Sequence, residues 1–161
     1  MQDQLREARA VFEGHLDRLQ KQGHESAIRF ETYTVIENAG RNQWKDQNLL
    51  KLRSRREGNA LMLEWYRRNW TRDGDGKRGT FHTYIRKRNT GKSGSVYSYD
   101  LDDLFKYSPE WSRGMVIEIE KEASTLRRQA RYCSSILVTI GRLERYLAYL
   151  DGADLPEEDE T

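Results

Sequence analysis

Residues 59–70 read NALMLEWYRRNW, residues 73–79 read DGDGKRG, and residues 80–88 read TFHTYIRKR. The first and last of these segments alternate between apolar and polar side chains, which is typical of β-strands with one buried face. The glycine-rich segment between them has the composition of a hairpin connection. Together they predict an antiparallel hairpin at the centre of the fold.

Further strands are expected on both sides of this hairpin. Residues 27–37 alternate with a period of two and predict a strand, while residues 49–56 favour a short strand over a helical turn. Residues 95–99 predict a brief last strand after a turn at 89–94. The predicted sheet is therefore an antiparallel meander.

Helical periodicity occurs at the two ends of the chain. Residues 3–22 predict an amphipathic helix that stops at Gly23, and residues 110–149 predict a long helix with an apolar stripe. The predicted fold class is α+β, an antiparallel β meander packed by an N-terminal helix and a long C-terminal helix. We expect one domain over residues 1–150. The apolar stripe of the long helix exceeds what a small sheet covers, so we also expect a homodimer or another helical partner.

The last residues, 151–161, are rich in acids and predict a disordered acidic tail. Such a tethered polyanion is expected to compete with DNA for a basic surface.

Composition favours a soluble, cytoplasmic protein. No apolar run approaches the roughly 20 residues that a membrane-spanning helix needs, and the first residues do not resemble a signal peptide. Cys133 is the single cysteine of the chain, which is consistent with a reducing compartment, and its place on the apolar stripe predicts a core position.

Charge is distributed unevenly along the sequence. Residues 1–40 carry a net charge of −2 and residues 93–161 carry −6, whereas residues 41–92 hold 15 Lys and Arg against 5 Asp and Glu, a net charge of +10. Such local positive charge indicates an anionic partner for the middle of the chain.

The predicted strands combine these cations with aromatic rings. Tyr66, Arg68 and Trp70 are expected on one side of their strand, opposite Leu61, Leu63 and Trp65. In the next strand we expect His82, Tyr84, Arg86 and Arg88 to lie opposite Phe81, Thr83, Ile85 and Lys87. Arginines suit phosphates and base edges, and flat rings stack on bases. The candidate nucleic-acid-binding residues are Arg55, Arg56, Tyr66, Arg68, Lys77, Arg78, His82, Tyr84, Arg86, Arg88 and Lys92.

Three other interpretations of this basic region stay open. The arginines and tyrosines can simply solvate an exposed sheet face. The acidic C-terminal helix or tail can supply the counter-charge from within the chain. An anionic membrane surface is the third partner considered, and an amphipathic helix would suit it better than strands.

Catalytic and metal-binding motifs are weak. Gly91-Lys92-Ser93 lacks the upstream glycine of a phosphate-binding loop, because that position is Arg86. Asp73-Gly-Asp-Gly lacks the twelfth-position glutamate of a calcium loop, which is Tyr84 here. His15, His24 and His82 are too far apart in sequence to form a metal-ligand motif. We therefore expect neither a catalytic centre nor a cofactor.

The aromatic segments resemble one known family. Leu63-Glu-Trp-Tyr-Arg-Arg-Asn-Trp70, Tyr84-Ile-Arg-Lys87, Tyr97-Ser-Tyr99, Pro109-Glu-Trp111 and the helix from Glu120 to Arg127 are similar to the MobI family of conjugative-transfer proteins. The resemblance covers roughly residues 50–145. It implies an accessory factor of bacterial mobile elements, needed to start DNA transfer at an origin of transfer, which acts beside a relaxase without cutting DNA.

Two functions are therefore considered. The first is a DNA-binding accessory protein of conjugative transfer that is not an enzyme. The alternative is a protein–protein adaptor that docks through its long C-terminal helix and uses the basic face only for solvation.

Overall fold

The computed structural model describes residues 1–72, 74–88 and 96–152. The long helices are α1 (Gln2–Ala39) and α3 (Glu110–Leu150), and the short ones are the 3-10 helix η1 (Trp44–Asp46) and α2 (Leu101–Phe105). The strands are β1 (Leu50–Glu57), β2 (Ala60–Arg72) and β3 (Arg78–Tyr84).

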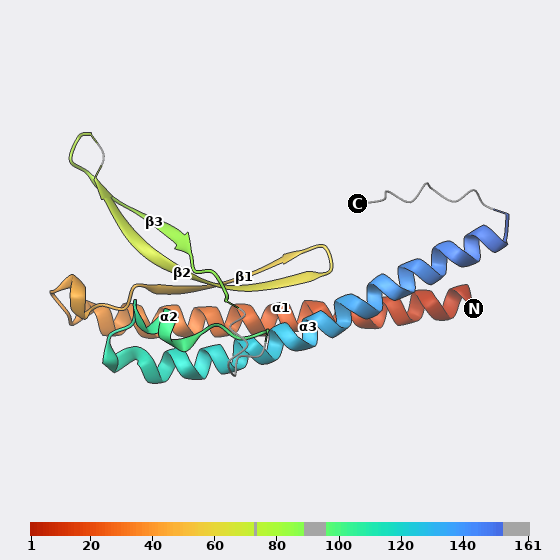
Figure 1. The fold of residues 1–161 in the computed structure, drawn as a ribbon, viewed down its shortest axis with the longest axis horizontal. Helices are drawn as coiled ribbons and strands as arrows, with labels where there is room; N and C mark the ends of the chain where they lie inside the picture. The colour runs from red at the N-terminus through yellow and green to blue at the C-terminus, as the bar shows by residue number, and fades with distance from the viewer. Residues whose placement is uncertain (73, 89–95, 153–161) are drawn as a thin grey trace.

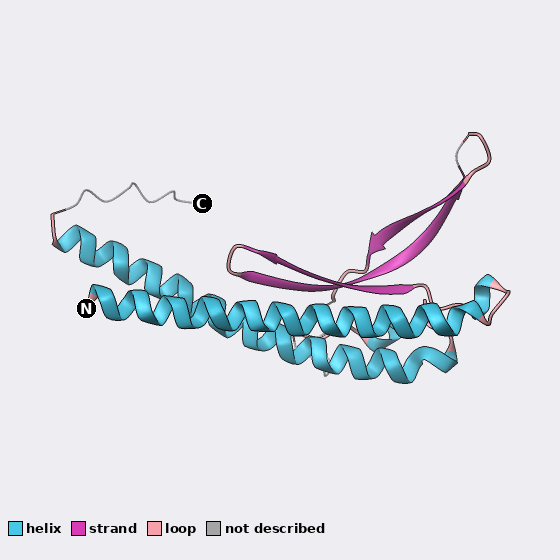
Figure 2. Ribbon diagram, turned by 180° about the vertical axis from the view of Figure 1, so that it is seen from behind, coloured by secondary structure: helices cyan, strands magenta, loops and turns pink. Residues whose placement is uncertain are grey.

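The two long helices lie side by side and antiparallel, and the sheet covers one side of this pair (Figures 1 and 2). All three strands are antiparallel in the order β1-β2-β3. The distal part of the β2–β3 hairpin rises away from the helices, and the far ends of the helices extend beyond the sheet on the other side (Figure 1). This arrangement confirms the predicted α+β fold.

The core contains two clusters of buried apolar residues between the sheet and the helices. In the first, Phe30 of α1 packs edge-on against Trp65 of β2, with ring centroids 4.9 Å apart. In the second, Leu16 and Leu19 of α1 meet Leu63 of β2 and an apolar stripe of α3. That stripe includes Cys133, which is 5% exposed, so its predicted core position is confirmed. Burial also raises the pKa of the Cys133 thiol.

The strand predicted at residues 27–37 is wrong, because these residues continue α1. Ala27, Phe30 and Thr34 are buried at helical spacing, whereas Ile28 and Ile36, which supported the strand, are 49% and 66% exposed. Packing against the sheet therefore overrides the β-propensity of this segment.

Gly23, predicted to end the first helix, lies inside α1 against Leu63 and Ser54 of the sheet. A Cβ atom at this position would lie 2.6 Å from the Leu63 Cδ2 atom. The glycine therefore permits close contact between helix and strand.

The brief strand predicted at 95–99 is also absent from its described part, residues 96–99. The backbone there bonds to side chains of α3: the Tyr99 N–H donates to Glu120, and the Tyr97 carbonyl accepts from Arg127. These bonds replace a strand partner. The predicted acidic tail lies outside the described residues except for Asp151 and Gly152. Among the helices described, none is both long and apolar enough to cross a bilayer.

Candidate nucleic-acid interface

The register of the sheet divides its side chains into two faces. Leu52, Leu63 and Trp65 point toward the helices and are 3%, 2% and 0% exposed. Because side chains alternate along a strand and paired residues share a face, the intervening residues point away from the helices. We call that surface the outer face. Its charged and aromatic members are Lys51, Arg53, Arg55, Glu57, Glu64, Tyr66, Arg68, Trp70, Arg72, Arg78, His82 and Tyr84.

Four predicted residues meet at the centre of the outer face. Tyr66 lies opposite Tyr84, and Arg68 lies opposite His82. The two tyrosine rings are 5.8 Å apart at an interplanar angle of 64°, and Tyr84 is 46% exposed. The Tyr99 hydroxyl donates to the Tyr84 hydroxyl across 3.4 Å, which ties this exposed ring to the core. The Tyr66 and Tyr84 rings therefore form a partly exposed aromatic surface with cations at its border.

Positive charge exceeds negative charge on the outer face, which holds six Lys and Arg side chains and two carboxylates. One of the six, Lys51, reaches back to α1, where its Nζ lies 3.3 Å from Glu31. Arg55 contacts both acids: its Nε donates to Glu64 across 3.1 Å, and its Nη1 lies 3.3 Å from Glu57. The other arginines of this face form no ion pair with any residue described: Arg53, Arg68, Arg72 and Arg78. Their charge is available to an anionic partner.

Two titratable groups respond to this environment. Burial, together with a hydrogen bond to Glu64, raises the pKa of Tyr66. Burial also lowers the pKa of His82 below 6.5, and the nearby Lys51 and Arg68 cations lower it further. The lowered pKa favours the neutral ring of His82 in the free protein.

Other predicted residues lie away from the centre of the outer face. Arg56 has the opposite parity and forms an ion pair with Asp17 of α1. Lys77 lies in the exposed turn between β2 and β3, and Arg78 begins β3. Lys92 is outside the described residues. Arg56 therefore connects the sheet to α1.

Arg86 and Arg88 follow the end of β3, so the face expected from strand alternation does not extend to them. Arg86 is exposed. The Arg88 Nε donates to Asp103 across 2.6 Å, beside α2. Strand alternation places Phe81 on the same side as Ile85, a position that predicts burial, but Phe81 is 52% exposed because the hairpin extends past the helices at this point.

Sequence analysis missed three cations of the outer face, Lys51, Arg53 and Arg72. The first two alternate with Leu52 and Ser54 in β1, so a firm strand assignment at residues 50–57 would have identified them.

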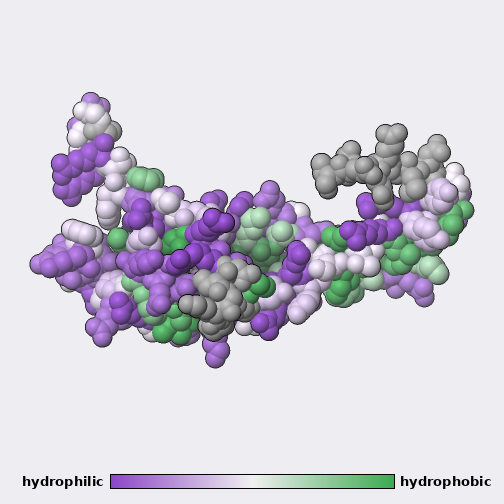
Figure 3. Space-filling model, viewed as in Figure 1, coloured by the Kyte–Doolittle hydropathy of each residue, from purple (hydrophilic) through white to green (hydrophobic). Residues whose placement is uncertain are grey.

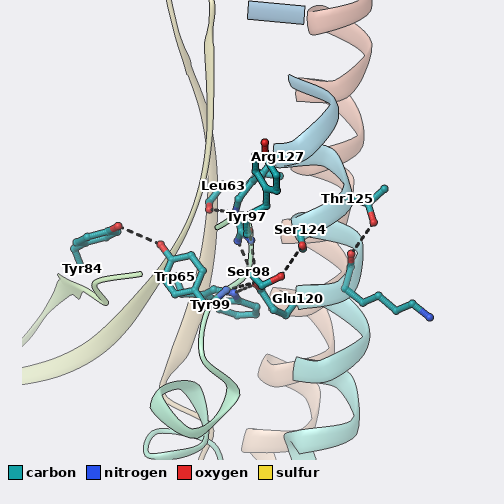
Figure 4. A network of polar contacts seen from close by, with 11 residues as sticks. Leu63, Trp65, Tyr84, Tyr97, Ser98, Tyr99, Glu120, Ser124, Thr125 and Arg127 are labelled. Atoms are coloured by element: carbon teal, nitrogen blue, oxygen red, sulfur yellow. Dashed lines mark hydrogen bonds and ion pairs between the residues drawn. The ribbon is translucent and has the colours of Figure 1, made fainter. Parts of the chain in front are cut away.

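A buried ion pair fixes the sheet to α3 directly behind the outer face (Figure 4). Glu120 and Arg127 of α3 have side chains 4% and 7% exposed, and the Arg127 Nη1 lies 2.9 Å from the Glu120 Oε1. The Trp65 indole donates to Glu120 across 2.6 Å, and the Arg127 Nε donates to the Leu63 carbonyl across 2.8 Å. Strand β2 is therefore held by polar as well as apolar contacts.

Sequence analysis considered the acids of α3 only as an internal counter-charge for the basic region and did not identify Glu120 as a buried group. Both of its oxygens accept hydrogen bonds from Arg127, and one also accepts from the Tyr99 backbone. Such complete pairing is what a buried charge requires. Across the described ranges, no group of three or more His, Cys, Asp or Glu side chains is placed to hold a metal ion.

These features define a class of protein, an antiparallel helix pair that carries a three-stranded sheet with a basic, aromatic outer face. The chain belongs to the MobI protein family, whose family model matches residues 19–141. This match confirms the resemblance seen in the sequence and connects the chain with mobilisation and conjugation. Searches of curated proteins and of solved structures found no match.

Proposed function

We propose that the protein binds DNA through the outer face and acts as a non-catalytic accessory factor of conjugative transfer, beside a relaxase at an origin of transfer. The observation that carries the proposal is that Arg53 and Arg68, which form no ion pair with a described residue, lie beside the Tyr66–Tyr84 ring pair. Arginine side chains bind phosphates and base edges, while exposed rings stack on bases or sugars. Membership of the MobI family supports the setting in DNA transfer.

The face is firmly held, which suits recognition by a preformed surface. The Glu120–Arg127 pair and the Trp65 indole anchor β2, the strand that contributes Tyr66 and Arg68. Little ordering is then required of the backbone when DNA binds, so less interaction energy is lost.

Fluorescence anisotropy tests the proposal. Labelled duplex carrying the element's own transfer origin is compared with a scrambled duplex of equal length and composition, at several salt concentrations. For the double variant Arg53→Gln/Arg68→Gln we expect weaker binding and a log–log salt slope lower by about 1.8, at roughly 0.9 for each phosphate that is no longer neutralised.

The matched control is Arg142→Gln/Arg145→Gln, which removes the same charge from the far end of α3. If the two double variants lose equal DNA affinity, the loss follows from net charge alone, which would contradict binding at the outer face. Incubation with supercoiled origin plasmid and Mg²⁺ tests the non-catalytic role, because nicking by the protein alone would contradict it.

An adaptor function is the second candidate, and one feature of α3 favours it. Exposed apolar residues recur along this helix at spacings of three, four and seven, and Figure 3 shows apolar residues gathered on this part of the molecule. They are Tyr132, Ile136, Leu143, Tyr146 and Leu150. This spacing is typical of a helix–helix seam.

The homodimer was expected from a different face of α3, the apolar stripe that includes Cys133, and that stripe is buried within the chain. A dimer through the exposed residues of α3 stays a prediction. Light scattering of the wild type and of Ile136→Glu/Leu143→Glu tests it, with a dimer expected only for the wild type. Heparin affinity separates the two candidate functions, since retention that falls steeply with salt favours DNA binding and indifference to heparin favours the adaptor.

A further inference from the structure

A second basic site lies where the hairpin ends, and Tyr84 borders both this site and the outer face. A cavity of about 270 Å³ opens between the end of β3 and the segment that carries α2. Four cations line it, Arg67, Arg86, Arg88 and Lys106, with Asp103 as its one acid. The lining therefore has a formal charge of +3.

Asp103 fixes two of these cations. Its carboxylate accepts from the Arg88 Nε across 2.6 Å and from the Lys106 Nζ across 2.7 Å. The Asp103 side chain is 12% exposed, whereas those of Arg88 and Lys106 are 52% and 60% exposed. The Arg88 and Lys106 hydrogen bonds lower the pKa of Asp103, so it stays ionised at neutral pH. The two cations are thus held in place while much of each remains accessible.

The other two cations have no carboxylate partner among the residues described. Arg67 is half-buried, and its guanidinium lies 5.0 Å from the centroid of the Tyr107 ring. Arg86 is exposed at the rim of the cavity. A ring-supported guanidinium presents its N–H groups in a fixed plane, the geometry that suits the oxygens of a phosphate.

The size of the cavity restricts the ligand. Pockets for drug-sized molecules measure about 300–1,000 Å³, so this one holds a phosphate with its sugar rather than a larger group. Four cations against one carboxylate also exclude an apolar occupant.

We infer that this cavity, the hairpin pocket, binds a phosphate group of single-stranded nucleic acid. The inference rests on the proposed function. Arg67 and Tyr66 are neighbours in β2 and project to opposite faces, and β3 is the edge strand of the sheet. A single DNA strand that leaves a duplex bound on the outer face reaches the pocket by turning around the β3 edge of the sheet. An unpaired strand bends sharply enough to do so, whereas the duplex has a persistence length of about 150 base pairs.

The test compares three labelled DNAs: a blunt duplex, the same duplex with a single-stranded 5′ extension of about six nucleotides, and that extension with a terminal 5′-phosphate. The extension is expected to raise wild-type affinity about tenfold, a typical contribution of charge-assisted hydrogen bonds. The variant Arg67→Gln/Arg86→Gln, which leaves the Asp103 contacts intact, should lose that gain and bind the blunt duplex within about twofold of the wild type.

The phosphorylated extension identifies the source of the phosphate. A further gain from the terminal phosphate assigns the pocket to a strand end, and equal affinities assign it to an internal phosphodiester. The inference would be overturned if the extension leaves wild-type affinity unchanged. It would also be overturned if Arg67→Gln/Arg86→Gln still binds the extended DNA more tightly than the blunt duplex.

The outer-face variant Arg53→Gln/Arg68→Gln keeps this test separate from the proposed function. It should weaken binding to the blunt duplex and keep the ratio of extended to blunt affinity. If no DNA binds, the full chain is titrated with inorganic phosphate and with thymidine by NMR. Shifts of the Ile85 and Tyr107 amides with phosphate alone would support the pocket even then, and their absence would overturn it.

Discussion

The inner and outer faces of the sheet belong to the same strands but differ in what holds their side chains. On the inner face, Trp65 is fully buried, packs edge-on against Phe30 and donates its indole N–H to Glu120. On the outer face, Tyr66 and Tyr84 pack against each other, Tyr66 donates to Glu64, and both rings stay partly exposed.

This difference separates stability from binding. Changes on the inner face leave cavities or unpaired buried groups, whereas changes on the outer face remove side chains that the fold does not need. Substitutions on the two faces, each with a matched control, therefore test whether stability and DNA binding depend on different side chains.

The largest effect is expected behind the inner face, at the buried ion pair. Glu120→Ala should lower the free energy of unfolding by about 3–5 kcal/mol, because it leaves the Arg127 guanidinium buried without its carboxylate. Glu118→Ala is the control, since that exposed glutamate lies 3.6 Å from Arg29 at the surface and its removal should cost at most about 1 kcal/mol. Equal losses in urea unfolding would show that the buried pair has no special role.

Leu63→Ala should cost about 2–5 kcal/mol through reduced burial and the cavity left behind. Phe81→Ala, at a position expected from sequence to be equally costly, should change stability by only about 0.5 kcal/mol because its ring is already 52% exposed. Thermal unfolding measures both. A costly Phe81→Ala would mean that the projecting hairpin is covered in solution.

On the outer face, Tyr84→Ala should reduce DNA affinity by about 1–3 kcal/mol, the usual contribution of a ring that stacks on a base, with little change in salt slope. Tyr132→Ala on α3 removes a ring of similar exposure away from the sheet and should leave affinity unchanged. Anisotropy titrations in which both variants bind alike would place the stacking surface elsewhere.

His82 should make DNA binding depend on pH. Burial and the Lys51 and Arg68 cations lower its pKa in the free protein, and nearby phosphates raise it again. Binding then takes up a proton, so affinity should increase by no more than about tenfold as pH falls from about 7.5 to 5.5. His82→Gln should remove this increase in titrations repeated across the range, and an unchanged profile would contradict a phosphate near His82.

The smallest stability effect is expected at Arg68. Arg68→Ala should change the free energy of unfolding by no more than about 0.5 kcal/mol, because the side chain forms no ion pair with a described residue. Arg88→Ala should lower the melting temperature more, since Arg88 is bonded to the largely buried Asp103. Alternation in the sequence gives Arg68 and Arg88 the same exposed position. Equal melting curves for the two variants would therefore support that prediction and contradict the structure.

Periodicity was sufficient to predict much of the fold. The alternation of Leu61, Leu63 and Trp65 correctly assigned β2 and its buried face, and the apolar stripe correctly assigned α3. The same argument failed at residues 27–37, where period two is visible in Ile28, Phe30 and Ile36. The helical alternative depends on small residues such as Gly23 and Ala27, whose role is visible only once the sheet lies against them.

The candidate site was predictable where strand pairing decides it. Tyr66, Arg68, His82 and Tyr84 come together because alternation within each strand and antiparallel pairing between them act together. Arg86 and Arg88 were misplaced because β3 ends at Tyr84, and the bond of Arg88 to Asp103 of α2 has no local sequence signal. Glu120 was missed because a buried and a solvated carboxylate look alike along a helix.

The projecting ends of α1 and α3 have a consequence for hydrogen exchange. No residue before Leu16 in α1 and none after Ile140 in the described part of α3 is buried, and these ends are joined by surface contacts such as that of Arg9 with Glu144. Segments with few buried contacts open locally without global unfolding. Amides in residues 2–15 and 141–150 should therefore exchange in a separate, faster phase, while those around the buried Leu63 and Trp65 of β2 exchange only when the whole protein unfolds.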